Sequence, residues 1–352
     1  MSKSGAIFSG LGFSARDIFH DTSSGMTTSH TPFARPSRVS LISGFGCIYV
    51  VWGTTYLGIR LAVADMPPFL MAAVRFLIAG GVLYGFLRLR GGPRPEAARW
   101  KEQSLVGLCL VGGNAVVCWA EQFVPSGLTA LAVGTAPFFM VIFSFLMPGG
   151  TRPSRWVVVG LLLGLAGLLI LFGPGAFPAG QRPPSLRVAG LFISSAAWCL
   201  GSVYSKHTGS KAAPAWTAAM QMLAGGAAML VVSFALGEER GLHLAAMTLT
   251  SWGAFTYLTV VGSLIAFPIY IWLLKHNPPA RVATYAYVNP VVAVLAGWLI
   301  LGESLQLRLF LAVPVLIGGV VIITTSGLKT RNAPEAEDSF SRRLSPAVQR
   351  GD

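Results

Sequence analysis

The chain has 352 residues, of which 53% are hydrophobic and 11% are charged. Soluble domains carry about 25% charged residues, so this composition excludes an ordinary soluble protein. The formal net charge of +13 would favour a nucleic-acid partner in a soluble chain, but most Lys and Arg here lie at the ends of apolar segments and in the tails. That is the pattern of membrane topology signals. The composition predicts an all-α polytopic membrane protein whose partner is the lipid bilayer, with no nucleic acid.

Ten apolar stretches follow one another along the chain, and a helix of about 20 residues crosses a ~30 Å hydrocarbon core. We expect them near residues 41–64, 68–87, 103–122, 126–147, 155–173, 187–206, 213–236, 250–274, 279–301 and 307–327. The polar N-terminal segment 1–40, in which Met26 is an alternative start, and the charged segment 328–352 are predicted to be disordered cytosolic tails. The Pro- and Gly-rich segment 174–186 is predicted to be a linker.

The first half of the apolar region recurs in the second half. An offset of 146 residues pairs Trp52 with Trp198, Pro68 with Pro214, Ala72 with Ala218 and Gly80 with Gly226, and an offset of 153 pairs Trp119 with Trp272, Pro137 with Pro290 and Arg155 with Arg308. This spacing predicts two five-helix repeats, 41–173 and 187–327. Because five is odd, the second repeat must enter the membrane upside down. Inverted repeats are typical of secondary transporters, whose substrate site lies near the midplane between the two copies.

The orientation follows from the positive charges. With the N-terminus inside, twenty of the 26 Lys and Arg lie in cytoplasmic segments and five in outer ones, and Arg75 lies within a span. This bias predicts a multi-pass protein of the plasma (inner) membrane with both termini in the cytoplasm.

Three charged residues are candidates for binding or for coupling to protons: Arg75, Glu121 and Glu303. Arg75 would cost roughly 2.5–3.5 kcal/mol at the centre of a lipid-facing helix, so it should face the bundle and have a partner. A structural ion pair explains it as well as a functional charge does. Its position in the second repeat is occupied by the neutral Gln221, so the fold does not need this charge twice.

Uncharged polar and aromatic residues within the spans are candidates for lining a substrate cavity. They are Trp52, Thr55, Tyr56, Asn114, Trp198, Ser202, Tyr285 and Asn289. Aromatic residues within spans more often pack or anchor a helix, whereas an amide in hydrocarbon needs a partner. The glycines of the fifth and tenth spans are expected to allow close helix packing; these are Gly160, Gly164, Gly167, Gly318 and Gly319.

The sequence contains no phosphate-binding G-x-x-x-x-G-K-[ST] motif, so it offers no site for ATP-driven transport. No cluster of residues within the spans has the spacing of a zinc site or a hydrolytic triad. We therefore expect no cofactor, no metal and no enzymatic activity.

Three blocks of the sequence resemble a known family. The blocks WGTTYLGIRLA…PPFLMAAVRFLIAGG, EQFVPSGLTALAVGTAPFFM and PARVATYAYVNPVVAVLAGWLILGESL resemble the EamA family of the drug/metabolite transporter superfamily, most closely its YedA-like exporters. The resemblance covers about residues 41–327. It implies ten transmembrane helices in two inverted five-helix EamA repeats around a central cavity, with alternating access. The first repeat departs from the family where Met147–Gly150 replaces a Leu-Gly-Glu ending.

The sequence thus predicts a secondary active transporter that exports small amino-acid-like metabolites or amphipathic toxic compounds, with protons as a candidate coupling ion. One alternative is a carrier of anionic substrates such as nucleotide sugars or sugar phosphates, which would require several basic residues in the cavity. Another is a membrane enzyme or scaffold that transports nothing. The substrate, the direction of transport, the coupling ion and the oligomeric state are left open.

Overall fold

The computed structural model describes residues 36–92, 95–124, 126–150, 152–172, 184–208, 212–301 and 307–326. The elements are almost all α-helices, and these ranges contain no strand. They are α3 (Arg38–Ala62), α4 (Pro68–Leu89), α5 (Ala97–Glu121), α6 (Ser126–Val133), α7 (Ala136–Leu146), α8 (Arg155–Phe172), α9 (Ser185–His207), α10 (Pro214–Leu236), η1 (Glu238–Gly241), η2 (Leu244–Ala246), α11 (Leu249–Tyr257), η3 (Leu258–Ile265), α12 (Ala266–His276), α13 (Pro279–Val282), α14 (Tyr285–Leu301) and α15 (Leu307–Ser326).

The prediction of an all-α polytopic membrane protein is confirmed. Within the described ranges, nine helical segments are long and apolar enough to cross a bilayer, and Arg155–Leu171 is a shorter apolar helix. The first helix begins at Arg38, inside the segment predicted to be a tail, because the Ser37 hydroxyl caps it by accepting from the Ser40 amide at 3.0 Å. The predicted tail segments 1–35 and 328–352 lie outside the described residues.

Two of the predicted spans are interrupted rather than continuous. The fourth is divided into α6 and α7, and the ninth into α13 and α14. At each break a threonine hydroxyl donates to the carbonyl three residues earlier, Thr135 to Ala132 at 2.6 Å and Thr284 to Arg281 at 2.7 Å. Such bonds compete with the helical ladder, which explains why apolar periodicity alone did not predict the breaks.

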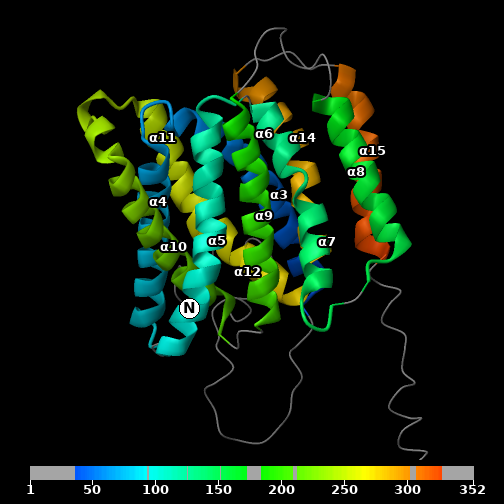
Figure 1. Cartoon of the computed structure of the whole chain (residues 1–352), viewed down its shortest axis with the longest axis horizontal. Coiled ribbons are helices and arrows are strands. Elements are labelled where there is room, and N and C mark those ends of the chain that lie inside the picture. Colours follow the sequence, from blue (N-terminus) through cyan, green and yellow to red (C-terminus); the bar gives the residue numbers. More distant parts are fainter. Residues whose placement is uncertain are drawn as a thin grey trace, which may run out of the picture.

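The helices form a single bundle in which each half contacts the other (Figure 1). Helix α10 packs on α4 and α5, α9 packs on α5, and α3 packs on α14. The contacts have an exchange pattern, in which a contact recurs with the two halves of the chain exchanged. The contact of α5 with α9 corresponds to that of α12 with α3. The contact of α3 with α14 corresponds to that of α9 with α6 and α7. Helices α8 and α15 run side by side at one edge of the bundle.

Glycines allow α8 and α15 to approach closely. A Cβ on Gly319 would stand 2.8 Å from the carbonyl oxygen of Gly160, and one on Gly160 would stand 3.0 Å from that of Gly319. A Cβ on Gly164 would meet the Tyr287 ring at 2.3 Å. The predicted packing role is confirmed for these glycines and for Gly167, but it is wrong for Gly318, which has nothing within 4 Å.

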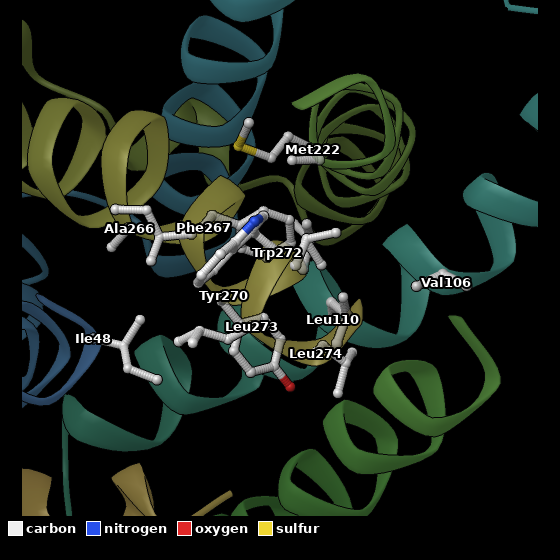
Figure 2. Close-up of a cluster of buried hydrophobic side chains, with 14 of the residues drawn as sticks. Ile48, Val106, Leu110, Met222, Ala266, Phe267, Tyr270, Trp272, Leu273 and Leu274 are labelled. Carbon is white, nitrogen blue, oxygen red and sulfur yellow. The ribbon is translucent and has the colours of Figure 1, made fainter. Parts of the chain in front are cut away.

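The largest apolar core surrounds α12. Its side chains Phe267, Tyr270 and Trp272 are almost completely buried, and they pack with Ile48 of α3 and Leu110 of α5 (Figure 2). Ile48 lies in the N-terminal half of α3, and Leu110 lies near the middle of α5. The core therefore fills the bundle toward the end where α3 begins and leaves space for a cavity toward the other end.

Candidate functional site

A cavity lies between the two halves of the bundle and contains about 690 Å³ of space not occupied by atoms, part of it open to solvent. Seven segments contribute to its wall: α3, α4, α5, α6, α7, α9 and the stretch from η3 to α14. Its lining residues are Trp52, Thr55, Tyr56, Ile59, Arg75, Phe76, Asn114, Val117, Val133, Ala136, Ser194, Ser195, Trp198, Gly262, Phe267, Tyr285 and Asn289. The wall is mostly apolar and aromatic with few polar groups, as is usual for small-molecule sites.

The cavity is displaced toward one end of the bundle. On α3 its lining residues run from Trp52 to Ile59, in the C-terminal half of the helix. On α5 they are Asn114 and Val117, again in the C-terminal half. The opposite end is closed by the packed core around Tyr270 (Figure 2).

Aromatic rings from both halves meet where the cavity ends. Trp52 and Trp198 stand edge to face with their ring centroids 5.5 Å apart at an interplanar angle of 84°, and Trp52 also lies 4.9 Å from Tyr270 and 5.1 Å from Tyr285. The Trp198 indole donates to the Tyr270 hydroxyl at 3.1 Å, and that hydroxyl shares a 2.6 Å hydrogen bond with Ser202. These bonds satisfy the polar tips of the rings in an apolar setting. The aromatic cluster therefore joins α3 to α9, α12 and α14 at this place.

Arg75 reaches the cavity from α4 and is only 3% exposed. Its Nε donates to the Ser263 hydroxyl at 2.8 Å, and its Nη1 makes a long contact of 3.4 Å with the Asn114 side-chain oxygen. The guanidinium also lies 4.8 Å from the centre of the Phe76 ring. The salt bridges among the described residues join Arg99 to Glu96 and Arg240 to Glu239, both near the surface, so Arg75 has no carboxylate partner there.

The segment that receives these bonds is a π-helix, η3, set between α11 and α12. Its Gly262 carbonyl accepts a hydrogen bond from the Trp52 indole at 3.2 Å, and its Ser263 hydroxyl accepts from Arg75. A π-turn changes the register of a helix and frees backbone groups, which is common at functional sites. Here it directs one carbonyl and one hydroxyl of the second half toward side chains of the first half.

Two further polar groups border the cavity. In the amide orientation that its neighbours require, the Asn289 nitrogen donates to the carbonyls of Tyr285 at 2.9 Å and Tyr49 at 3.2 Å. The Ser195 hydroxyl is buried and has no hydrogen-bond partner among the described residues, although it lines the cavity. Ser195 thus offers an unused donor and acceptor at the wall.

Glu121 lies near the end of α5, two turns beyond Asn114 on the same side of the helix. It is 5% exposed, and both of its carboxyl oxygens are buried without a hydrogen-bond partner in the part of the chain that the structure describes. It does not line the cavity, and it forms no ion pair with Arg75. Its surroundings therefore leave this carboxyl unpaired within a membrane-crossing helix.

The structure brings most of the predicted candidates to one place. Eight of them line the cavity: Trp52, Thr55, Tyr56, Arg75, Asn114, Trp198, Tyr285 and Asn289. Ser202 does not line the cavity, and its hydroxyl bonds the Trp198 carbonyl and the Tyr270 hydroxyl. Glu121 does not line the cavity either. Glu303 lies outside the described residues.

Several lining residues were not among the candidates. Ser194, Ser195 and Gly262 gave no sequence signal beyond their small size, and Ser263, which does not line the cavity, contacts Arg75 through the π-turn. Phe267 could have been found, because it stands 153 residues after Asn114 and so occupies the equivalent place in the second half. Within the described ranges no three His, Cys, Asp or Glu side chains gather where they could hold a metal ion.

Comparisons with known proteins identify the family. The sequence profile of the EamA-like transporter family matches residues 42–173 and 186–325. The chain is 38% identical to the "Uncharacterized inner membrane transporter YedA" of Escherichia coli K12, over 81% of this chain and 90% of that protein. It is also similar to the "Probable amino-acid metabolite efflux pump" of the same strain, over 81% of this chain and 95% of that one, at 25% identity.

The fold also has a counterpart among solved structures. A crystal structure with 23% sequence identity aligns with a TM-score of 0.65, over 81% of this chain and 97% of the other. At this identity the likeness shows the fold alone. The two matched segments and the YedA relative show that the chain is a member of the EamA-like transporter family.

Proposed function

We propose that the protein is a secondary active transporter that exports small amino-acid-like metabolites or amphipathic toxic compounds through this cavity by alternating access. The observation that carries the proposal is the cavity itself, because both halves of the chain line it and aromatic rings from both halves close it at one end. A small-molecule substrate fits a concave, mostly apolar site with a few polar groups. The amino-acid-like class is supported by the efflux pump among the relatives.

The proposed architecture is ten transmembrane helices in two inverted repeats, 41–173 and 187–327, joined by the linker 174–186. The two matched family segments support this division. The exchange pattern of helix contacts supports it too, since an inverted repeat would relate each contact to a partner in the other half. Rocking of one repeat against the other would then expose the cavity to each side in turn.

The proposed location is the inner membrane, with both termini in the cytoplasm. The positive charges of the sequence support this orientation. In that orientation α3 and α5 end at the outer face, so the cavity opens outward and the aromatic cluster separates it from the cytoplasm.

We also propose that transport is coupled to protons and that Glu121 or Arg75 is the group that senses them. Ionisable groups within membrane spans commonly belong to proton relays, and an unpaired buried carboxyl is suited to exchange a proton as the repeats move. Substrate counterflow in proteoliposomes, with and without a pH gradient, tests this. Glu121→Gln or Arg75→Gln should make flux independent of the gradient, and unchanged coupling in both variants would refute this role.

The residues of the cavity wall argue against the alternative function, a carrier of nucleotide sugars or sugar phosphates. Arg75 is the single Lys or Arg among the lining residues of the described chain, and a diphosphate would need several cations. Family membership favours transport over a membrane enzyme or scaffold.

The proposed transport is tested with the purified full-length protein in liposomes. A panel of amino acids, amines and amphipathic toxic compounds should contain members that show counterflow, and the Trp52→Ala and Trp198→Ala variants should lose most of it. Equal flux in empty liposomes, or full flux in both variants, would contradict the proposal.

A further inference from the structure

The Arg75 guanidinium has more donors than partners. A guanidinium carries five N–H donors, and the structure uses one on Ser263 and a second, at the long distance of 3.4 Å, on Asn114. Its Nη2 has no hydrogen bond to a described residue, and it lies 3.4 Å from the place where a Cβ on Gly262 would stand. The absence of a side chain at Gly262 keeps the space beside Nη2 open. The unused donors therefore border the cavity.

Such a group requires an anion. Removing a cation from water without a paired charge is costly, and buried cations in proteins are almost always paired. No carboxylate among the described residues lies within salt-bridge distance of Arg75, although the side chain is 3% exposed. The fixed fork of a guanidinium matches the two oxygens of a carboxylate, so a bound carboxylate would supply the missing partner.

The remaining wall limits which anion fits. Apart from Arg75, the lining residues in the described part of the chain carry no charge, and most are aromatic or aliphatic. One cation balances one negative charge, so a phosphate or a dicarboxylate would leave charge unpaired in an apolar site. The unpaired Ser195 hydroxyl adds one neutral hydrogen-bonding group at the wall. The wall suits a single carboxylate attached to an apolar body.

The second half of the chain shows that the fold does not need the charge. The position equivalent to Arg75 holds Gln221, which is completely buried and bonds Gln103 at 2.7 Å and Ser205 at 3.2 Å. Gln221 does not line the cavity. An amide therefore suffices where the helix only packs, and a guanidinium is present where the helix borders the cavity.

We infer that Arg75 is the carboxylate-binding residue of the cavity and that its ligands are small monocarboxylates with an apolar body. The carboxylate can be that of a simple organic acid or that of an amino acid, whose ammonium would then need uncharged acceptors at the wall such as the Ser195 hydroxyl. Ser263 holds the guanidinium by its Nε, so that the Nη groups remain available to the ligand. The inference rests on the proposed transport function only in treating the cavity as the substrate site.

Binding to the purified full-length protein tests this inference without requiring transport. Each probe set keeps one apolar body and varies the head group: L-leucine, 4-methylpentanoate and 3-methylbutylamine, with matching sets built on isopropyl and benzyl bodies. Ligand-induced shifts of the unfolding temperature and titrations of tryptophan fluorescence report affinity, since Trp52 and Trp198 line the cavity.

At least one carboxylate-bearing probe should bind, and the amine with the same body should bind at least about tenfold more weakly, because charge-assisted hydrogen bonds are lost. The acid and the amino acid distinguish the two sources of the carboxylate. Binding of the amine as tight as that of its acid, or no binding of any carboxylate in the three sets, would overturn the inference.

Three variants sharpen the test. Arg75→Gln copies the residue at the equivalent position and should weaken carboxylate binding by about 10- to 100-fold. Gly262→Ala keeps the charge but brings a methyl group against Nη2, so it should weaken binding as well. Arg88→Gln removes an arginine of the same helix whose side chain bonds, among the described residues, the Gly92 carbonyl alone, and it should change nothing. Wild-type affinity in Arg75→Gln would overturn the inference.

The outcomes separate this inference from the proposed function. Carboxylate binding that depends on Arg75, together with no flux of any probe in liposomes, would sustain the inference and contradict transport of these compounds. Flux of the amines at the wild-type rate in Arg75→Gln, with no binding of carboxylates, would sustain transport and overturn the inference. If Arg75→Gln does not fold, Arg75→Lys retains the charge without the fork and should bind more weakly than wild type.

Discussion

The indole rings of Trp52 and Trp198 meet edge to face across the centre of the bundle, 5.5 Å apart, although 145 residues separate them in the chain. They occupy equivalent positions in the two repeats, so each half contributes the same residue to one contact. Each indole also donates a hydrogen bond into the second half, Trp52 to Gly262 and Trp198 to Tyr270. Two residues that the internal repeat relates thus meet at the closed end of the cavity.

This contact should be measurable as an energetic coupling. Edge-to-face aromatic pairs contribute about 0.5–1.5 kcal/mol beyond the area that they bury. A double-mutant cycle of Trp52→Leu and Trp198→Leu, read by unfolding in detergent, should give a coupling free energy in that range. Trp252→Leu replaces a tryptophan that is 41% exposed and serves as the control. Additive effects at Trp52 and Trp198 would show that the rings do not stabilise one another.

Glu238 caps a helix of the other repeat. Its carboxylate accepts the backbone amides of Leu70 at 2.8 Å and Phe69 at 3.3 Å, at the start of α4, and the Ser233 hydroxyl at 3.0 Å. The N-cap residue Pro67 offers no side-chain acceptor, so Glu238 satisfies amides that would otherwise be orphaned.

Glu238→Ala should therefore lower the free energy of unfolding by about 1–2 kcal/mol, the usual value of a helix cap. Thermal unfolding in detergent measures it. Glu239→Ala, at the neighbouring surface position, is the matched control and should have a much smaller effect. An equal loss in both variants would mean that the cap does not stabilise α4.

Asp65 makes the stability of the connections before α4 and before α11 depend on pH. Its Oδ2 accepts from the Thr248 amide at 2.9 Å and from the hydroxyls of Thr248 and Ser251, both at 2.7 Å. The Ser251 hydrogen bond, followed by those of Thr248, holds the pKa of Asp65 below its usual value.

A lowered folded-state pKa means that this contribution is present above the unfolded value of about 3.9 and is lost as pH falls through the folded value. Asp65→Asn should therefore be less stable than wild type at neutral pH, and the difference should shrink in acid below about pH 4. Unfolding temperatures measured across this range provide the test. A difference that stays constant from neutral to acid pH would contradict the carboxylate's role.

The pair Gly318 and Gly319 offers a direct test of helix packing. A side chain at Gly319 would meet the α8 backbone at 2.8 Å, whereas one at Gly318 would meet nothing within 4 Å. Gly319→Val should destabilise the α8–α15 pair by about 1–3 kcal/mol, the usual cost of overpacking. Gly318→Val should be nearly neutral. Similar unfolding temperatures for the two variants would argue against the close contact.

Much of the fold was predictable because hydrophobic length and internal repetition are properties of the sequence. The offset of 146 residues paired Trp52 with Trp198, and the offset of 153 paired Pro137 with Pro290. The helix breaks at Thr135 and Thr284 and the π-turn at Gly262 were not predictable, because they depend on hydroxyl and backbone bonds that leave apolar periodicity unchanged.

The site was predictable where a residue is costly in hydrocarbon. Arg75 and Asn289 require partners there: Asn289 finds two carbonyls, and Arg75 finds the Ser263 hydroxyl but no carboxylate among the described residues. Ser195, Ser263 and Gly262 are small residues that are common in any membrane helix, so the place of Ser195 at the cavity and of Ser263 and Gly262 beside Arg75 follows only from the register of the packed helices. Glu238 and Asp65 likewise accept hydrogen bonds from backbone amides that lie far away in the sequence, those of Leu70 and Thr248.

The proposed transport requires that one cavity between the two repeats opens to each side of the membrane in turn. Val133→Cys, in a protein whose four cysteines are replaced, places a thiol at a partly exposed position of the wall and removes no side-chain hydrogen bond. Labelling by a membrane-impermeant thiol reagent is then measured from each side of oriented vesicles, with and without transported substrate. We expect labelling from the outer side at rest and labelling from the inner side to rise during transport. Labelling confined to one side under every condition would contradict alternating access.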